Sequence, residues 1–356
     1  MYTSHYTVDI PSISVLDWLF GGAFNALPPT PVLIDADNPL RWLSLATYRV
    51  WSKRLGLGLA KHGLRKGKCV LCYANGTLAH QVAMMGTIAS GAYFVAPRTS
   101  ATEERQVEIL EMVRPSIVLV ERYLLESVTA AVERAREECR PRSIWIIDDD
   151  LFDSGLTPPY DNEANNWKHL MSPLAEAIAF DWSLAHCTDL DQIVFLKFTS
   201  GSTGKPKHIV HTHRSMVSAL CSLRDLCNRD PRYQSKDDPV RHLIISREDG
   251  DKTRPRRHSL FLWPSLGIET YVMAECSPAK VLAAMERYRI TDLSTNIPFL
   301  VDLEIEACTS CMKYDHTALR AVHTIGGGLG VRALDLLRSL WPDGRIMLQD
   351  KYGSSE

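Results

Sequence analysis

The chain has 356 residues, of which 45% are hydrophobic and 23% are charged, and its formal net charge at pH 7 is −2. This length can bury a large core and favours more than one structural unit, while the near-neutral charge argues against nucleic acid or an anionic membrane surface as a partner. No apolar run approaches the roughly 18 residues of a membrane span. The first residues lack the charged and apolar regions of a secretory signal, so we expect a protein of the cytoplasm or the peroxisome.

In the first half, segments with helical periodicity alternate with short apolar segments typical of strands. Ser44 is placed to cap the first helix, which ends at Gly63. The predicted strands are 70–73, 93–96, 117–120 and 143–147, and the other predicted helices are 78–90, 103–113 and 123–138. This alternation predicts right-handed βαβ units and a mostly parallel sheet.

Residues 148–191 interrupt this alternation with many Asp, Asn and Pro residues, and we interpret them as a connection. Beyond them the predicted strands are 193–198, 209–212, 291–295, 320–325 and 346–349, and the predicted helices are 278–289 and 331–341. We therefore predict the α/β class, with two packed α/β subdomains of mostly parallel strands. The predicted boundaries are 1–190, which includes the connection, and 191–356.

The most informative segment is the run 198–207, Phe-Thr-Ser-Gly-Ser-Thr-Gly-Lys-Pro-Lys. Glycines let backbone N–H groups approach an anion, hydroxyls add donors, and lysine adds a point charge suited to phosphate. The alternative is a Gly/Ser hairpin turn with solvated lysines, but a string this long and ordered favours a phosphate-binding loop. It is not the common P-loop, because Pro206 follows Lys205 where that motif needs Ser or Thr.

This loop resembles the [ST]-S-G-[ST]-T-G-x-P-K-G signature of the adenylate-forming superfamily, which includes acyl-CoA synthetases, 4-coumarate–CoA ligases, luciferases and adenylation domains of nonribosomal synthetases. The match runs through Lys207, and His208 replaces the final Gly. The turn 326–330 is by itself a weak dinucleotide fingerprint or a tight turn, but it has the place of the family's Gly-rich turn. The ending 352–356, Tyr-Gly-Ser-Ser-Glu, is similar to the family's Y-G-x-T-E. The order of the three motifs strengthens the resemblance, which in detail is closest to acyl-CoA synthetases and 4-coumarate–CoA ligase-like enzymes.

The resemblance implies the fold of the N-terminal domain of these enzymes and the activity of an AMP-forming acid–thiol ligase. A small aryl or fatty carboxylic acid would react with ATP to give acyl-AMP, and CoA would then displace AMP. The implied nucleotide-binding residues are Thr199, Ser200, Gly201, Ser202, Thr203, Gly204, Lys205, Lys207, Gly327, Gly328, Asp350, Lys351, Tyr352 and Ser355. Glu356 would bind Mg²⁺, which prefers oxygen ligands.

The sequence departs from the family in two places. The family's L-P-x-F-H-x-x-G stretch, which lines the carboxylate pocket, corresponds here to 258–264, and His258 is the candidate for its histidine. The chain also stops at Glu356, before the family's ribose-binding Asp, its hinge and the C-terminal lid that carries the catalytic Lys. We therefore interpret the chain as a truncated product whose second subdomain and CoA site are incomplete, and we expect little or no full activity.

Three functions remain open from the sequence. The first is an acyl-CoA-synthetase-type ligase, intact or as a fragment. The second is the adenylation part of a nonribosomal-synthetase-like reductase, which segments 207–213 and 352–356 slightly favour. The third is a non-catalytic nucleotide-binding module.

The cysteines and the clustered histidines do not predict a metal site. The two C-x-x-C pairs, at 69–72 and 308–311, lie too far apart for zinc-finger spacing, and the first is interpreted as a buried strand. Strand alternation could place His211 and His213 on one face, but no carboxylate or cysteine accompanies them. The charged run 246–257 has no periodicity and is interpreted as a solvated loop rather than a phosphate-binding patch.

Overall fold

The computed structural model describes residues 7–21, 27–153, 156, 163, 165–182, 189–198, 208–235, 237–245, 257–274, 276–309, 314–325 and 347–351. The chain divides into two compact units, the first of residues 1–30 and 43–230 and the second of residues 31–42 and 231–356. Each unit has its own mostly parallel sheet with helices, which confirms the α/β class. The predicted boundary at 190/191 differs from this division, because the strand that follows it pairs with the first sheet.

The first unit contains a six-stranded sheet in the order β6-β5-β3-β4-β7-β8. Its strands are β3 (Cys69–Tyr73), β4 (Tyr93–Val95), β5 (Ile117–Val120), β6 (Ser143–Ile146), β7 (Ile193–Phe198) and β8 (His208–Thr212). Its helices are α1 (Val15–Phe20), α2 (Leu45–Lys61), α3 (Leu78–Ala89), α4 (Glu103–Val113), α5 (Leu125–Arg134), α6 (Leu174–Ala179) and α8 (His213–Arg229). Neighbouring strands are parallel except β7 and β8, which are antiparallel.

The central strands of this sheet are buried on both faces. Leu71, Tyr73 and Val118 pack with residues of α4 and α5 in one apolar cluster. Val70 and Cys72 alternate with them and are also fully buried. Burial on both faces explains why the strands appear in the sequence as continuous apolar runs, and it confirms the prediction that 69–72 is a buried strand.

The predicted helix 123–138 is wrong in its extent. A 3-10 turn at Arg122–Leu124 precedes α5, and a second one at Glu137–Cys139 follows it. The helix ends because the backbone of Ala135 is extended, with ψ of 151°. The Arg140 guanidinium also donates to the carbonyl oxygens of Glu133 and Ala135, at 2.6 and 3.0 Å, and so satisfies groups that a continuing helix would use.

Helix α2 begins and ends as the sequence predicts. Its first turn is a capping box, in which the Thr47 amide donates to Ser44 Oγ at 3.1 Å and the Ser44 amide donates to Thr47 Oγ1 at 2.9 Å. Beyond its last turn, Gly63 has a φ of +86°, a conformation that glycine adopts without strain.

Replacing Ser44 with Ala is expected to lower the free energy of unfolding by about 1 kcal/mol, because the first turn of α2 loses its side-chain acceptor. Urea unfolding followed by circular dichroism measures the change. Ser44→Thr keeps the hydroxyl and is the matched control. An alanine variant as stable as the threonine variant would contradict the capping role.

The second unit contains a seven-stranded sheet in the order β13-β12-β11-β9-β10-β1-β2. Its strands are β1 (Leu33–Asp35), β2 (Trp42–Leu43), β9 (Arg241–Ile245), β10 (Glu269–Met273), β11 (Asp292–Thr295), β12 (Ala321–Ile325) and β13 (Met347–Lys351), and its helices are α9 (Arg257–Ser265), α10 (Pro278–Tyr288) and α11 (Ile297–Thr309). The pairs from β13 to β1 are all parallel. The predicted helix 331–341 lies outside the described residues.

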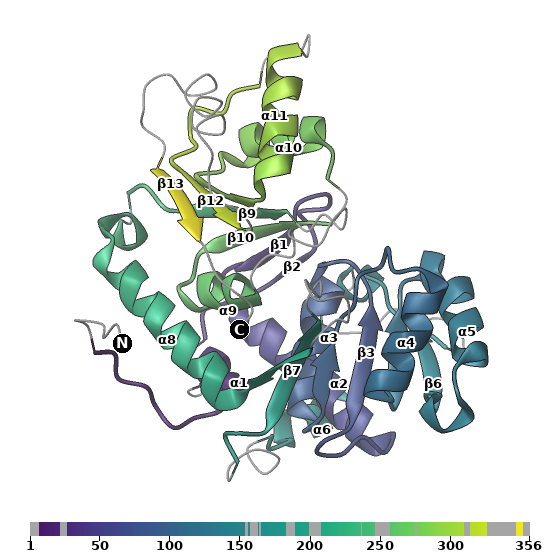
Figure 1. The fold of residues 1–356 in the computed structure, drawn as a ribbon. Coiled ribbons are helices and arrows are strands. Elements are labelled where there is room, and N and C mark those ends of the chain that lie inside the picture. Colours follow the sequence, from purple (N-terminus) through teal and green to yellow (C-terminus); the bar gives the residue numbers. More distant parts are fainter. Residues whose placement is uncertain are drawn as a thin grey trace, which may run out of the picture. The chain divides into compact units, whose positions relative to one another are not determined.

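The two faces of this second sheet differ. Apolar residues such as Leu243, Leu293 and Val322 pack with α10 and α11 in one cluster, while α9 lies on the other side of the sheet (Figure 1). Within the part of the chain that the structure describes, no helix combines the length and the apolar character needed to cross a bilayer.

Candidate nucleotide-binding site

The predicted phosphate loop, residues 199–207, lies outside the described residues, but the strands on both sides of it are described. β7 ends at Phe198 and β8 begins at His208, and these two residues face each other in the antiparallel register. The predicted loop therefore joins the ends of a two-stranded ribbon. A P-loop instead follows a strand and opens a helix, so this topology agrees with the distinction made from the sequence.

Two ion pairs lie at the opposite end of this ribbon. Lys66 Nζ lies 2.9 Å from Asp189 Oδ2, and Arg214 Nε lies 2.8 Å from Asp191 Oδ1. The hydrogen bond from Lys66 lowers the pKa of Asp189, and the bond from Arg214 lowers the pKa of Asp191. All four side chains are exposed, so the pairs orient the chain where it enters β7 and contribute little to stability.

A second group of predicted residues starts at one edge of the other sheet. β12 and β13 are parallel neighbours, with Thr324 opposite Asp350 and Ile325 opposite Lys351. The chain therefore leaves both strands at the same carboxyl edge, the edge at which open α/β sheets bind ligands. Asp350 and Lys351 lie in β13, and their side chains are outside the described part. Gly327, Gly328, Tyr352, Ser355 and Glu356 are not among the described residues.

His258 lies in the first turn of α9 and is half-buried. The residues Leu260 to Trp263 of the same helix are buried. The structure places His258 on α9, and its role in a carboxylate pocket stays a prediction.

The charged run is expected to take no part in nucleotide binding. Residues 246–256 lie outside the described part, between the end of β9 and the start of α9. Replacing them with a Gly/Ser linker should change the Kd for ATP by no more than about twofold, the effect typical of surface changes. Titration calorimetry measures this Kd. A folded variant that no longer binds ATP would instead assign the run to the site.

The model of the family described as AMP-binding enzyme matches residues 23–356. The chain belongs to this family. Among curated relatives, the nicotinic acid-CoA ligase olcI of Penicillium canescens is 23% identical over 308 residues, which are 79% of this chain and 51% of the relative. The 4-coumarate–CoA ligase 2 of Oryza sativa is 25% identical over 369 residues, with 98% of this chain and 58% of the relative covered.

A third relative is a much larger protein. The peramine synthetase ppzA of Metarhizium majus is 29% identical over 204 residues, which are 56% of this chain and 6% of the synthetase. The chain thus spans about half the length of the curated CoA ligases it matches.

The luciferase-like enzyme of the mealworm Zophobas morio has a similar structure. The TM-score is 0.77 at 19% identity, with 99% of this chain and 74% of the other chain covered. The similarity bears out the predicted fold, that of the N-terminal domain of adenylate-forming enzymes.

Proposed function

We propose that this chain activates a carboxylic acid with ATP, as the first step of an AMP-forming acid–thiol ligase. The match of the AMP-binding family over residues 23–356 carries the proposal. The relatives named as CoA ligases support a second step, in which the CoA thiol displaces AMP. The chain spans about half the length of those relatives. Both steps of the reaction and the identity of the acid are therefore proposals. The acid would be a small aryl or fatty acid.

In the first step a carboxylate oxygen attacks the α-phosphorus of ATP. The new bond gives acyl-AMP, and the bond to pyrophosphate breaks, so the leaving group carries away the negative charge. Such a step depends on positioning and on neutralising charge as it develops. Residues 199–207 would supply backbone N–H groups, hydroxyls and the Lys205 and Lys207 ammonium groups to the β- and γ-phosphates, a donor set that suits them.

The carboxyl edge of β12 and β13 would hold the rest of the nucleotide. Gly327 and Gly328 would line the adenine and acyl pocket, and Ser355 would contact the α-phosphate. Glu356 offers a carboxylate for Mg²⁺, which when bound would neutralise phosphate charge. This arrangement is supported by the parallel register of β12 and β13, because the segments that follow the two strands begin at the same edge of the sheet. His258 would lie at the acid's carboxylate.

A second candidate is the adenylation part of a nonribosomal-synthetase-like reductase. Segments 207–213 and 352–356 favour it, and a peramine synthetase is among the relatives, matched over 56% of this chain. In that case the acyl-AMP would be transferred to the thiol of a carrier domain rather than to free CoA.

Pyrophosphate release across a panel of aryl, fatty and amino acids, with and without CoA, tests both candidates. Both candidates predict release that needs a particular acid. Because the CoA site of this chain is expected to be incomplete, the thioester is sought with the chain extended by the lid domain of a CoA ligase, where a CoA thioester of the same acid supports the ligase and its absence favours the carrier-dependent candidate. Release that is the same with and without every acid would contradict both.

A further inference from the structure

Three side chains of the kinds that bind metals meet inside the second unit. They are His242 on β9, Asp292 on β11 and His323 on β12, and they are 0%, 1% and 3% exposed. One ligand atom from each lies within 4.8 Å of the other two. None of these residues belongs to the predicted ATP site.

The strand register explains why they meet. In the parallel sheet Asp292 is opposite His242, and Ser294 is opposite His323. Asp292 and Ser294 are two residues apart on β11 and so point to the same face. The cluster therefore lies on the face toward α9, opposite the apolar cluster with α10 and α11.

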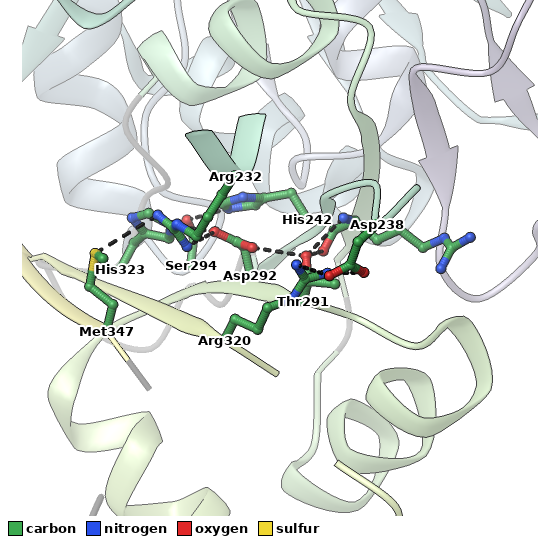
Figure 2. Close-up of polar contacts among 10 residues, drawn as sticks. Arg232, Asp238, His242, Thr291, Asp292, Ser294, Arg320, His323 and Met347 are labelled. Carbon is green, nitrogen blue, oxygen red and sulfur yellow. Dashed lines mark hydrogen bonds and ion pairs between the residues drawn. The ribbon is translucent and has the colours of Figure 1, made fainter. Parts of the chain in front are cut away.

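Hydrogen bonds orient the possible ligands (Figure 2). His323 Nε2 lies 3.2 Å from Asp292 Oδ1, and Thr291 Oγ1 donates to Asp292 Oδ2 at 2.8 Å. His242 Nε2 lies 2.7 Å from Ser294 Oγ. Thr291 and Ser294 are outside the ligand set, and partners of this kind fix the orientation of metal-binding carboxylates and histidines in known sites.

The cluster also has an apolar wall and an unused nitrogen. The Trp263 ring of α9 stacks on His242 with centroids 4.7 Å apart and lies 5.9 Å from the ring of His323. Such a wall excludes water and strengthens electrostatic interactions. Nδ1 of His323 is buried and has no hydrogen-bond partner among the described residues. A buried imidazole nitrogen without a partner is costly unless another group binds it.

We propose that His242, Asp292 and His323 bind a divalent transition metal ion of the zinc class. Two imidazoles and one carboxylate suit zinc, and three protein ligands leave a fourth position for water. With metal–ligand distances of about 2.0–2.1 Å, tetrahedral ligands lie roughly 3.4 Å apart. The ligand atoms, which lie within 4.8 Å of one another, would therefore have to approach by up to about 1.4 Å when the metal binds. The site is separate from the proposed adenylation reaction and does not depend on it.

Arg232 gives the proposal a specific electrostatic test. Its Nη1 atom lies 3.5 Å from Asp292 Oδ1, so a guanidinium charge stands beside the carboxylate that would bind the metal (Figure 2). Like charges repel strongly where water is excluded. Removing this charge in Arg232→Met should therefore tighten metal binding, although it removes a partner of the carboxylate.

The experiment uses the full chain, freed of metal with a chelator that is then removed and kept in a phosphine reductant, and titrates it with Zn²⁺ or with Co²⁺. We expect one metal per chain, visible Co²⁺ bands of a tetrahedral site, and a rise in the unfolding temperature with Zn²⁺. Asp292→Asn and His323→Ala should each weaken binding by about tenfold or more. His169→Ala removes an exposed histidine of the first unit and is the matched control, with unchanged affinity.

X-ray absorption of the zinc-loaded wild-type protein needs no variant and keeps the proposal testable if a variant fails to fold. The proposal predicts nitrogen and oxygen ligands with imidazole scattering. Sulfur ligands would place the metal on cysteines and overturn it. Absence of stoichiometric binding, or equal affinity in the wild type and in folded Asp292→Asn, would show that the cluster is a hydrogen-bonded polar group only.

Discussion

Lys207→Ala and Gly201→Val are each expected to weaken ATP binding by roughly 10- to 100-fold. The lysine would make a charged hydrogen bond to a phosphate, and such bonds contribute about 1.5–3 kcal/mol. At position 201 a valine side chain would keep the backbone from approaching the phosphates, because glycine alone leaves that space open. The antiparallel ends of β7 and β8, at Phe198 and His208, fix where this loop begins and ends.

Titration calorimetry with ATP and Mg²⁺ measures both variants against the wild type. Lys53→Ala is the control for loss of a lysine charge, since Lys53 lies on α2 and donates to the carbonyl oxygen of Ile178 at 3.2 Å. Its Kd should equal that of the wild type. Equal ATP affinity in all four proteins would reject the phosphate-loop assignment.

Gly58→Ala is expected to destabilise the first unit by about 1–3 kcal/mol, the usual cost of overpacking. A Cβ atom at this position of α2 would lie 1.6 Å from the carbonyl oxygen of Leu170. The chain passes this close because Arg54 binds it there, donating from Nε to the Ser172 carbonyl oxygen at 2.9 Å. In an unhindered helix the same substitution would stabilise by about 1 kcal/mol, so the sign of the effect is itself the test.

Chemical unfolding of the full chain measures this change. Lys61→Ala lies on the same helix, with an exposed side chain paired to Glu176, and should change stability by no more than about 0.5 kcal/mol. A Gly58→Ala protein that is as stable as the wild type, or more stable, would contradict the close contact with Leu170.

The sequence predicted the first unit well for physical reasons that particular residues illustrate. Every residue of β3 is buried, so the strand stands out as an apolar run. Helix α2 carries local signals at both ends, Ser44 as cap and Gly63 beyond its last turn. The prediction was wrong where a side chain from outside the helix determines its end. The Arg140 side chain satisfies the carbonyl oxygens of Glu133 and Ala135, where α5 ends.

Several elements were not predicted. Helix α8 begins at a capping box of Thr212 and Ser215, a signal present in the sequence but obscured by the polar residues that follow. The strand β9 and the helix α11 are both apolar segments. Periodicity alone does not decide whether such a segment forms a strand or a helix.

Of the two candidate sites, one has local motifs in the sequence and the other forms only in the folded sheet. The ATP site was predicted because its motifs are continuous in sequence, although most of its residues lie outside the described part. The cluster of His242, Asp292 and His323 was missed because only the strand register brings these distant residues together. Its one signal in the sequence is an ionisable side chain in each of three short segments that mix polar and apolar residues.

Formation of acyl-AMP in a single turnover tests the proposed activation most directly. The chain, in excess over ATP and with Mg²⁺ and one acid at a time, is quenched and analysed by mass spectrometry. We predict an adenylate whose mass follows the acid supplied, which is absent without the acid and strongly reduced in Lys207→Ala. If ATP binds but no adenylate forms from any aryl, fatty or amino acid, the activation of a carboxylic acid by this chain is contradicted.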